Sequence, residues 1–274
     1  MNRPPPRLLA DSRLDLPEVT LVAASSKAMA ATIRALRLSL GQIRPARAIL
    51  FSDVLLEADA VADVEFVNVP RMNGREAYSR FILKELADHI ETDFVLCVQW
   101  DGYVLNGQNW SEEFLGVDYI GAPWPQFDDG CDVGNGGFSL RSRRLLQACK
   151  DERIGVDIPE DLAICRLARP WLEADYGIRF AEHRLARRFA YERTAPHGDE
   201  FGFHGAFNMP GIMASAEYRQ VMSSLDTGVL RHSDKVEHLK DAFRRLDFAS
   251  ARLMVKSMLP GAGERAHFSK HGGL

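Results

Sequence analysis

The apolar and polar residues of the first hundred positions alternate between the period of a strand and the period of a helix. Four short apolar runs, rich in β-branched residues, predict strands at residues 19–25, 46–53, 64–70 and 94–100. Between them, residues 27–43 and 76–90 repeat apolar side chains at helical spacing. This alternation predicts an α/β fold, with a mixed, mostly parallel sheet flanked by helices.

The second half of the chain is less regular and then becomes helical. Residues 133–146 predict a glycine-lined turn, a short strand and a helix, and residues 158–178 predict a helix opened by an acidic pair. Residues 216–258 are expected to be wholly helical, with one apolar stripe formed by Val236, Leu239, Phe243 and Leu246. Three consecutive prolines mark the N-terminus as an extended arm. We therefore expect a flexible arm (1–16), a catalytic domain (17–210) and a helical C-terminal appendage (211–274).

Composition and charge limit the classes of binding partner and the cell compartment that we expect for the protein. The formal net charge of −4 gives no general attraction to nucleic acid, and no apolar stretch is long enough for a signal peptide or a transmembrane span. Residues 231–274 hold nine Lys/Arg against five Asp/Glu, which indicates either a solvated helix face or a weak peripheral membrane contact. The four cysteines lack the spacing of a zinc site, and a disulfide framework is not expected in a chain of this size. We expect a cytoplasmic protein, with peripheral contact at the inner face of a membrane as the alternative.

The candidate chemistry begins where predicted strands end, because ligands of such sheets gather at the carboxyl ends of their strands. Ser25, Asp53 and Asp101 all stand at predicted strand ends. Asp101 lies in QWDGYVLN (99–106), where a carboxylate can hold a divalent cation and Gly102 permits close approach by a ligand. An Asp-Gly turn explains the same pair equally well.

Three further motifs each allow a chemical and a structural interpretation. The glycines of VGNGGFSLRSRRLL (133–146) let backbone N–H groups approach a ligand, or form a tight turn. The carboxylates of PED (159–161) suit a helix start, and one of them can also act as a general base. In FGFHG (201–205), His204 is a metal ligand or a buried histidine with satisfied hydrogen bonds, and taken alone the second is favoured.

Taken together and in this order, the motifs resemble those of the GT-A glycosyltransferases. The pattern is similar to the fringe and β-1,3-galactosyltransferase type, in a bacterial branch marked by QWDGYVLN, GNGGFSLRS and PED. The resemblance covers residues 17–206. It implies a hexosyltransferase-like enzyme of the EC 2.4 class. Such an enzyme moves a sugar from a nucleotide-diphosphate sugar, commonly a UDP-sugar, to a glycan or other hydroxyl acceptor in polysaccharide biosynthesis.

The resemblance also assigns roles to individual residues. Asp161 would be the base that deprotonates the acceptor, Glu160 would orient the acceptor, and Asp101 and His204 would ligate Mn²⁺ or Mg²⁺. Gln99 and Trp100 occupy the earlier positions of the family's D-x-D motif, so Asp101 is its one carboxylate here. Contacts to the donor nucleotide are expected from Ser25, Asp53, Tyr78, Lys84, Trp100, Asp101 and Gly102. Contacts to the acceptor or donor sugar are expected from Trp124, Asn135, Gly136, Gly137 and Phe138.

A single base predicts an inverting, in-line displacement, because a retaining double displacement needs a second nucleophile on the opposite face of the sugar. Two other functions remain open at this point. One is a catalytically silent module that binds a nucleotide-sugar or glycan on the same fold, and the other is a protein-interaction scaffold. The enzyme hypothesis requires Asp101, Asp161 and His204 to converge in space.

Overall fold

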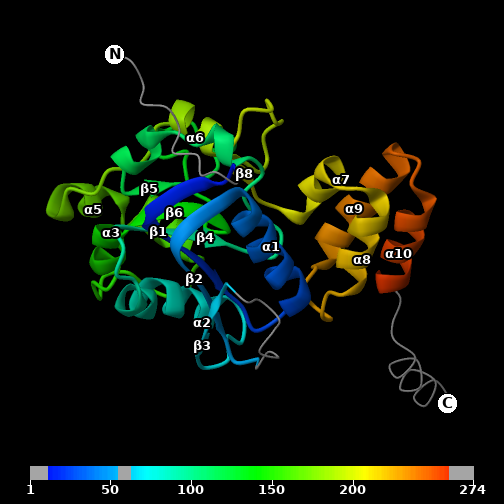
Figure 1. The fold of residues 1–274 in the computed structure, drawn as a ribbon, viewed down its shortest axis with the longest axis horizontal. Helices are drawn as coiled ribbons and strands as arrows, with labels where there is room; N and C mark the ends of the chain where they lie inside the picture. The colour runs from blue at the N-terminus through cyan, green and yellow to red at the C-terminus, as the bar shows by residue number, and fades with distance from the viewer. Residues whose placement is uncertain (1–11, 55–62, 259–274) are drawn as a thin grey trace, which may run out of the picture. The chain divides into compact units, whose positions relative to one another are not determined.

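The computed structural model describes residues 12–54 and 63–258, and the chain divides into two compact units, Met1–Ala206 and Phe207–Leu274. The first unit is an α/β domain and the second is helical (Figure 1). Residues 1–11 of the expected arm lie outside the described residues. Strand β1 already begins at Leu14, five residues before the predicted strand, so the last residues of that expected arm belong to the sheet.

The first unit is built on a six-stranded sheet in the order β3-β2-β1-β4-β6-β5. Strands β1 to β4 run parallel, and β6 is antiparallel to both of its neighbours. The predicted α/β fold with a mixed, mostly parallel sheet is therefore confirmed. The strands are β1 (Leu14–Ala24), β2 (Ile43–Ser52), β3 (Glu65–Asn68), β4 (Phe94–Val98), β5 (Tyr119–Ile120) and β6 (Phe138–Ser142), and a separate parallel pair is formed by β7 (Ala190–Tyr191) and β8 (Gly202–Phe203).

Helices flank this sheet (Figure 1). The α-helices are α1 (Met29–Gln42), α2 (Arg75–Arg80), α3 (Arg143–Ala148), α4 (Glu160–Leu162), α5 (Arg169–Tyr176) and α6 (His183–Phe189). The π-helical turns are η1 (Phe81–Glu85) and η5 (Ala163–Leu167), and the 3₁₀ turns are η2 (Leu86–His89), η3 (Gly107–Asn109), η4 (Glu112–Gly116) and η6 (Ala206–Asn208).

The central strands are apolar on both faces because both faces are buried. In β4, Leu96 and Val98 belong to one hydrophobic cluster, whereas Val95 and Cys97 belong to the cluster on the other side. Side chains alternate between the two faces of a strand, so a continuous apolar run is what a doubly covered parallel strand requires. The run FVLCV was readable from the sequence for this reason.

The second unit contains α7 (Met209–Ile212), α8 (Ser215–Ser223), α9 (His232–Arg244) and α10 (Phe248–Met258). The expectation that residues 216–258 are wholly helical is wrong, because the chain reverses after α8 and again after α9. Gly228 supplies a backbone φ of 84° in the first connection. None of the helices in the described ranges combines the length and apolar character that crossing a bilayer requires.

Candidate functional site

The strand order identifies where a ligand of this sheet should bind. The chain places β2 and β3 on one side of β1 and then returns to place β4 on the other, so the topology switches between β1 and β4. In open α/β sheets, ligands bind outside the carboxyl ends of the strands at such a switch point. Ser25 follows β1 directly, and Asp101 lies in the turn after β4. Asp53 follows β2, the next strand along the same edge.

Asp101 is held in a tight turn, and one of its oxygens faces His204. The N–H of Gly102 donates to the carbonyl of Gln99 at 3.0 Å, which closes a four-residue turn. Asp101 Oδ2 accepts from the backbone N–H of Ala206 at 3.1 Å. Its Oδ1 is buried and has no hydrogen-bond partner within the described part of the chain. The Asp-Gly turn is therefore present, and it leaves Oδ1 facing His204.

His204 lies between two carboxylates. Its Nε2 is 3.4 Å from Asp101 Oδ1, and its Nδ1 is 3.4 Å from Glu192 Oε1. The short strands explain this arrangement: β7 and β8 are parallel with Tyr191 opposite Phe203, so Glu192 and His204 follow the two strands at the same level. Burial lowers the pKa of His204, but the charges of Asp101 and Glu192 outweigh burial and raise it to about 10.

Two glycines make room for the His204 ring. A Cβ on Gly137 would lie 2.0 Å from His204 Nε2, and a Cβ on Gly102 would lie 2.9 Å from its Cδ2. The neighbouring Gly136 is constrained by Glu160, since a Cβ there would lie 1.8 Å from Glu160 Oε1. In the structure, the absence of a Cβ at these glycines therefore lets His204 and Glu160 pack directly against the backbone.

Asp161 is bound to the same glycine segment. Its Oδ2 accepts from the N–H of Gly136 at 3.2 Å, and its Oδ1 accepts from the N–H of Leu162 at 2.8 Å. Because Gly137 is the next residue, one dipeptide contacts both Asp161 and His204. Asp101, Asp161 and His204 therefore gather around Gly136–Gly137.

The electrostatic setting of Asp161 suits a proton acceptor. Burial raises the pKa of Asp161, and the nearby negative charge of Glu160 raises it further, to about 6. Hydrogen bonds from Gly136 and Leu162 and the positive charge of Arg141 oppose this increase. A carboxyl whose pKa is about 6 is ionised at neutral pH and still basic enough to take a proton.

Glu160, the other carboxylate of the PED motif, is paired with a buried arginine that the sequence analysis missed. Arg141 Nη2 lies 3.0 Å from Glu160 Oε1, and the side chains are 0% and 7% exposed. Arg141 also donates from Nε to Ser139 Oγ at 3.0 Å. The sequence pattern does not distinguish an arginine that points into the core from one on the exposed face of a strand. Because Arg141 belongs to the run RSRR (141–144), the pattern instead suggests an exposed basic cluster.

The residues expected to contact the donor nucleotide fall into two groups. Tyr78 is close to the site, because its hydroxyl accepts from Gln99 Nε2 at 3.0 Å and Gln99 Oε1 is 3.4 Å from His204 Nε2. Asp53 has a buried Oδ1 without a hydrogen-bond partner among the described residues. Lys84 is engaged elsewhere: its Nζ donates to the carbonyls of Cys149 and Asp151 at 3.0 and 2.7 Å.

Of the residues expected to contact the sugar or acceptor, some lie beside the site and others pack in the core. Asn135 is buried beside the site with a backbone φ of 68°, and its Nδ2 has no partner in the described ranges. Trp124 covers Gly134, where a Cβ would lie 2.1 Å from the indole ring. Phe138, which was expected to contact the acceptor or donor sugar, is 0% exposed, and its ring packs with Phe189 in the core.

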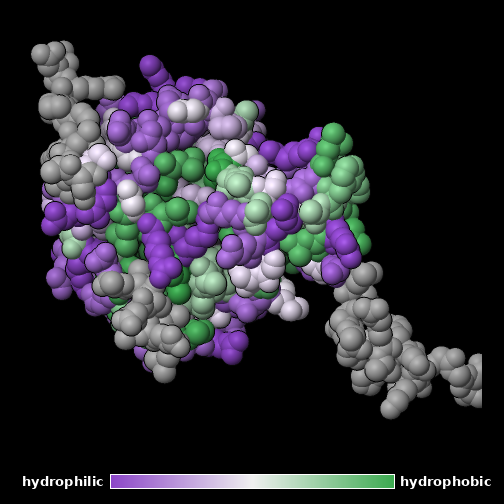
Figure 2. All heavy atoms as spheres, turned by 45° about the vertical axis from the view of Figure 1, so that its right-hand side comes forward, coloured by the Kyte–Doolittle hydropathy of each residue, from purple (hydrophilic) through white to green (hydrophobic). Residues whose placement is uncertain are grey.

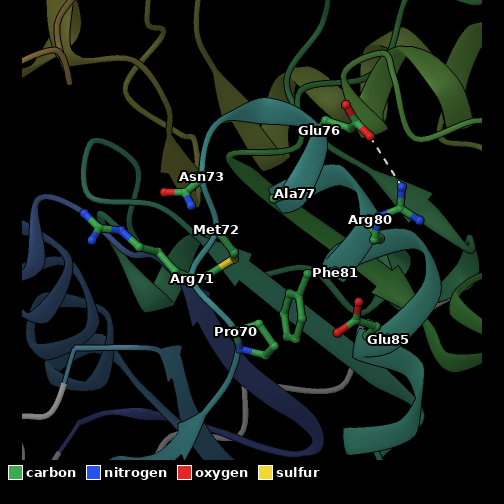
Figure 3. Close-up of a pocket in the computed structure, with 9 residues that line it drawn as sticks. All are labelled: Pro70, Arg71, Met72, Asn73, Glu76, Ala77, Arg80, Phe81 and Glu85. Carbon is green, nitrogen blue, oxygen red and sulfur yellow. Dashed lines mark hydrogen bonds and ion pairs between the residues drawn. The ribbon is translucent and has the colours of Figure 1, made fainter.

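A separate pocket of about 260 Å³ lies further along the carboxyl edge, after β3 (Figure 3). Pro70 and Phe81 face each other across it, while Arg71 points away from them. Arg71 instead lies 3.9 Å from Asp53, and the N–H of Met72 donates to Ser26 Oγ at 2.9 Å. The pocket therefore adjoins the β1 and β2 ends of the edge. Its lining residues are Pro70, Arg71, Met72, Asn73, Glu76, Ala77, Arg80, Phe81 and Glu85.

Within residues 12–54 and 63–258, no group of three or more His, Cys, Asp or Glu side chains is arranged to hold a metal ion. Asp101 and His204 are a pair of two possible ligands that face each other. Two neighbouring ligands of an octahedral ion are about 3 Å apart when each bond is about 2.1 Å long. The separation of 3.4 Å between Asp101 Oδ1 and His204 Nε2 is close to that value. Further ligands would have to come from a bound substrate or water.

Comparison with known proteins places this site within a family. A family model described as "Protein of unknown function (DUF5672)" matches residues 62–204, slightly more than half of the chain. The chain belongs to the DUF5672 family. Asp101, Asp161, Glu192 and His204 all lie within the matched segment, whereas the helical unit lies outside it.

No curated protein matches the chain. Among solved structures, it is similar to the mannosyltransferase PcManGT from Pyrobaculum calidifontis, in complex with GDP-Man and Mn²⁺. The sequence identity is 12%, the match covers 99% of this chain and 80% of that chain, and the TM-score is 0.45. Because neither comparison supplies a function, the chemistry of the DUF5672 site has to be inferred from its own residues.

Proposed function

We propose that the protein is a glycosyltransferase that moves a sugar from a nucleotide-diphosphate sugar to a hydroxyl acceptor. The observation that supports this most strongly is the gathering of Asp101, Asp161 and His204 around Gly136–Gly137. These groups lie beside the switch point of the sheet, where a ligand of this fold class binds. One carboxylate has a pKa suited to a base, and a second faces a histidine at 3.4 Å, close to the separation of two metal ligands.

Asp161 would deprotonate the acceptor hydroxyl as the hydroxyl attacks the anomeric carbon of the donor. Its two backbone hydrogen bonds fix the carboxylate, and its raised pKa favours proton uptake near neutral pH. The bond from the anomeric carbon to the diphosphate breaks as the new glycosidic bond forms. Because a single base serves this displacement, we propose inversion at the anomeric carbon.

Glu160 would act through Asp161 rather than on the acceptor. Its carboxylate is tied to Arg141, and its charge helps to raise the pKa of Asp161. The acceptor-orienting role expected from the resemblance is therefore replaced in our proposal by a positioning role.

Asp101 Oδ1 and His204 Nε2 would hold a divalent cation, Mn²⁺ or Mg²⁺, beside the donor diphosphate. Because Asp101 and Glu192 raise the pKa of His204 to about 10, the imidazole would have to release its Nε2 proton for the ion to bind. Such an ion supplies positive charge to the departing diphosphate. Glu192, at the other ring nitrogen, would fix the orientation of the imidazole. The protein groups alone provide two ligands, so we expect the ion to bind tightly only together with the nucleotide.

The donor nucleotide would extend along the carboxyl edge from Asp101 toward Asp53. Neighbouring strands are about 4.8 Å apart, so the three steps from β4 to β3 span roughly 14 Å. Ser25, Asp53 and the pocket of Figure 3 lie along this path. We propose a UDP-sugar as the donor and a glycan hydroxyl as the acceptor.

A thermal-shift screen with UDP-, GDP- and dTDP-sugars, each with and without Mn²⁺, tests this function. A nucleotide present at 100 times its dissociation constant should add about 2.7 kcal/mol to the free energy of unfolding. We expect one nucleotide class to raise the melting temperature and Mn²⁺ to increase the rise. If every donor leaves the melting temperature unchanged, the proposal fails.

A further inference from the structure

Four large apolar side chains of the helical unit are exposed, three of them around the connection between α9 and α10 and the fourth, Val255, two turns further along α10. Phe243 is 53% exposed, Leu246 73%, Phe248 65% and Val255 43%. The rings of Phe243 and Phe248 are 6.5 Å apart, so they form one group. Figure 2 shows hydrophobic side chains on the surface of this unit. Single exposed apolar residues are ordinary, whereas a cluster of them marks an interaction surface.

Leu246 occupies a backbone position where a leucine is unfavourable. Helix α9 ends with a Schellman motif, in which the N–H of Asp247 donates to Ala242 at 2.8 Å and the N–H of Leu246 to Phe243 at 3.1 Å. The motif requires a left-handed residue, and Leu246 has a φ of 56°. Glycine is the usual residue there because it carries no Cβ. Neither the backbone conformation nor core packing accounts for this exposed leucine.

The same hairpin is basic in an acidic chain. Residues 240–256 carry a net charge of +3, although the whole chain carries −4; the cations are Lys240, Arg244, Arg245, Arg252 and Lys256. Both carboxylates of this segment are engaged. Asp241 pairs with Arg245 at 2.7 Å, and Asp247 accepts from the N–H and hydroxyl of Ser250 at the start of α10.

The apolar and cationic side chains share helix faces. In α10, Phe248, Arg252 and Val255 follow one another at intervals of four and three residues. In α9, Lys240 and Phe243 are three residues apart. Residues at these intervals lie on one side of a helix. The exposed surface thus combines apolar side chains at the hairpin turn with cations beside them.

We propose that this surface, formed by Phe243, Leu246, Phe248, Val255, Arg252 and Lys256, docks on a membrane that carries anionic lipid headgroups. Apolar side chains enter the boundary between headgroups and acyl chains, while Lys and Arg attract anionic headgroups. A second copy of the chain is a poorer occupant. A two-fold interface would bring the same patch from both copies together and oppose their cations.

Co-sedimentation with phospholipid vesicles tests this inference on the full chain. The wild type is expected to bind vesicles of phosphatidylcholine mixed with phosphatidylglycerol, to bind pure phosphatidylcholine less, and to be released by salt. Leu246→Gly should reduce binding about tenfold or more, because the most exposed of the inserting side chains is removed. Its melting temperature should stay equal or rise, since glycine suits the left-handed position. Arg252→Glu with Lys256→Glu should abolish the preference for phosphatidylglycerol.

Leu167→Ser is the matched control, because Leu167 is 67% exposed in the first unit and should leave vesicle binding unchanged. The inference is overturned if the wild type ignores phosphatidylglycerol vesicles, or if Leu246→Gly binds them as well as the wild type. It is also overturned if the wild type forms dimers that Leu246→Gly dissociates, since the patch would then be a contact between copies. Capture of an acidic protein by the patch, without vesicle binding, would likewise identify a different occupant.

Discussion

At the scale of single residues, Asp161 combines features with opposite effects on its pKa. Two backbone N–H groups and the charge of Arg141 favour the carboxylate, whereas burial and Glu160 favour the protonated acid. The second pair prevails, and the pKa is raised to about 6. This placement makes the base of the proposed reaction sensitive to pH in a range that is convenient to measure.

We expect the rate of sugar transfer to fall as the pH is lowered through about 6, with a slope approaching tenfold per pH unit. The direction follows from the role: a base must be ionised to accept a proton, and Asp161 becomes protonated below its pKa. The measurement is kcat/KM between pH 5 and 8. A profile that stays flat through pH 6 in the wild type would argue against Asp161 as the base.

Glu192 is the second residue whose role can be tested alone. Its carboxylate lies 3.4 Å from His204 Nδ1, on the side of the ring away from Asp101. We expect Glu192→Gln to weaken Mn²⁺ binding about 10–100-fold in the presence of the nucleotide, as loss of a supporting carboxylate does in metal sites. Calorimetric titration of Mn²⁺ gives the affinity, and Glu113→Gln, which alters a surface pair with Arg188, is the control. Equal Mn²⁺ affinities for wild type and Glu192→Gln would remove Glu192 from this role.

The sequence predicted part of this arrangement. Asp101 and Asp161 stand where strand and helix signals change, and such positions can be read from periodicity. Glu192 was missed because its place depends on the pairing of two strands of two residues each, with eleven residues between Tyr191 and Phe203 in the sequence. Arg141 was missed because burial of a charged side chain depends on a partner far along the chain.

At the scale of elements, the segment between β5 and β6 organises the site. Gly136 and Gly137 precede β6, and each admits the side chain of a different motif: Glu160 from α4 and His204 from the end of β8. The sequence indicated that these glycines mattered. The sequence analysis expected a ligand to approach these glycines closely. The side chains that do so, Glu160 and His204, are distant in the sequence, and local residue spacing does not reveal such contacts.

We expect Gly137→Ala to lower the free energy of unfolding by about 1–3 kcal/mol, as overpacking does. The added Cβ would lie 2.0 Å from His204 Nε2, so the ring must move, and the contact with Asp101 should be lost with it. Chemical denaturation measures the change. Gly116→Ala is the control, because, apart from its two chain neighbours, no atom of the described residues lies within 4 Å of its added Cβ. Similar unfolding free energies for the two variants would contradict the packing described here.

In the helical unit, the pattern of apolar residues predicted a longer helix than the structure contains. Apolar spacing through Leu246 suggested that the stripe of α9 continues, but the Schellman motif ends the helix at Arg244. A leucine in a left-handed conformation gives no signal in the sequence, since glycine is the residue that normally marks such an ending.

At the scale of the whole molecule, the sheet order determines whether distant motifs can meet. Alternating strands and helices predicted a mostly parallel sheet, and this was confirmed. The order β3-β2-β1-β4 does not follow from the alternation, yet it places the end of β4 beside the end of β1. Antiparallel β6 then pairs with β4, with Phe138 opposite Val98, which brings Gly137 to the level of Gln99 and the turn that holds Asp101.

The central claim is that Asp161 acts as the base at a site shared with Asp101 and His204, and the transfer rate of Asp161→Asn tests it most directly. The rate is measured with a saturating donor from the nucleotide screen and its acceptor, beside Asp88→Asn, which alters a surface ion pair with Lys150. We predict that Asp161→Asn binds the donor like the wild type and transfers sugar about 10²–10⁴-fold more slowly, while Asp88→Asn keeps the wild-type rate. A near-normal transfer rate in Asp161→Asn would contradict the claim.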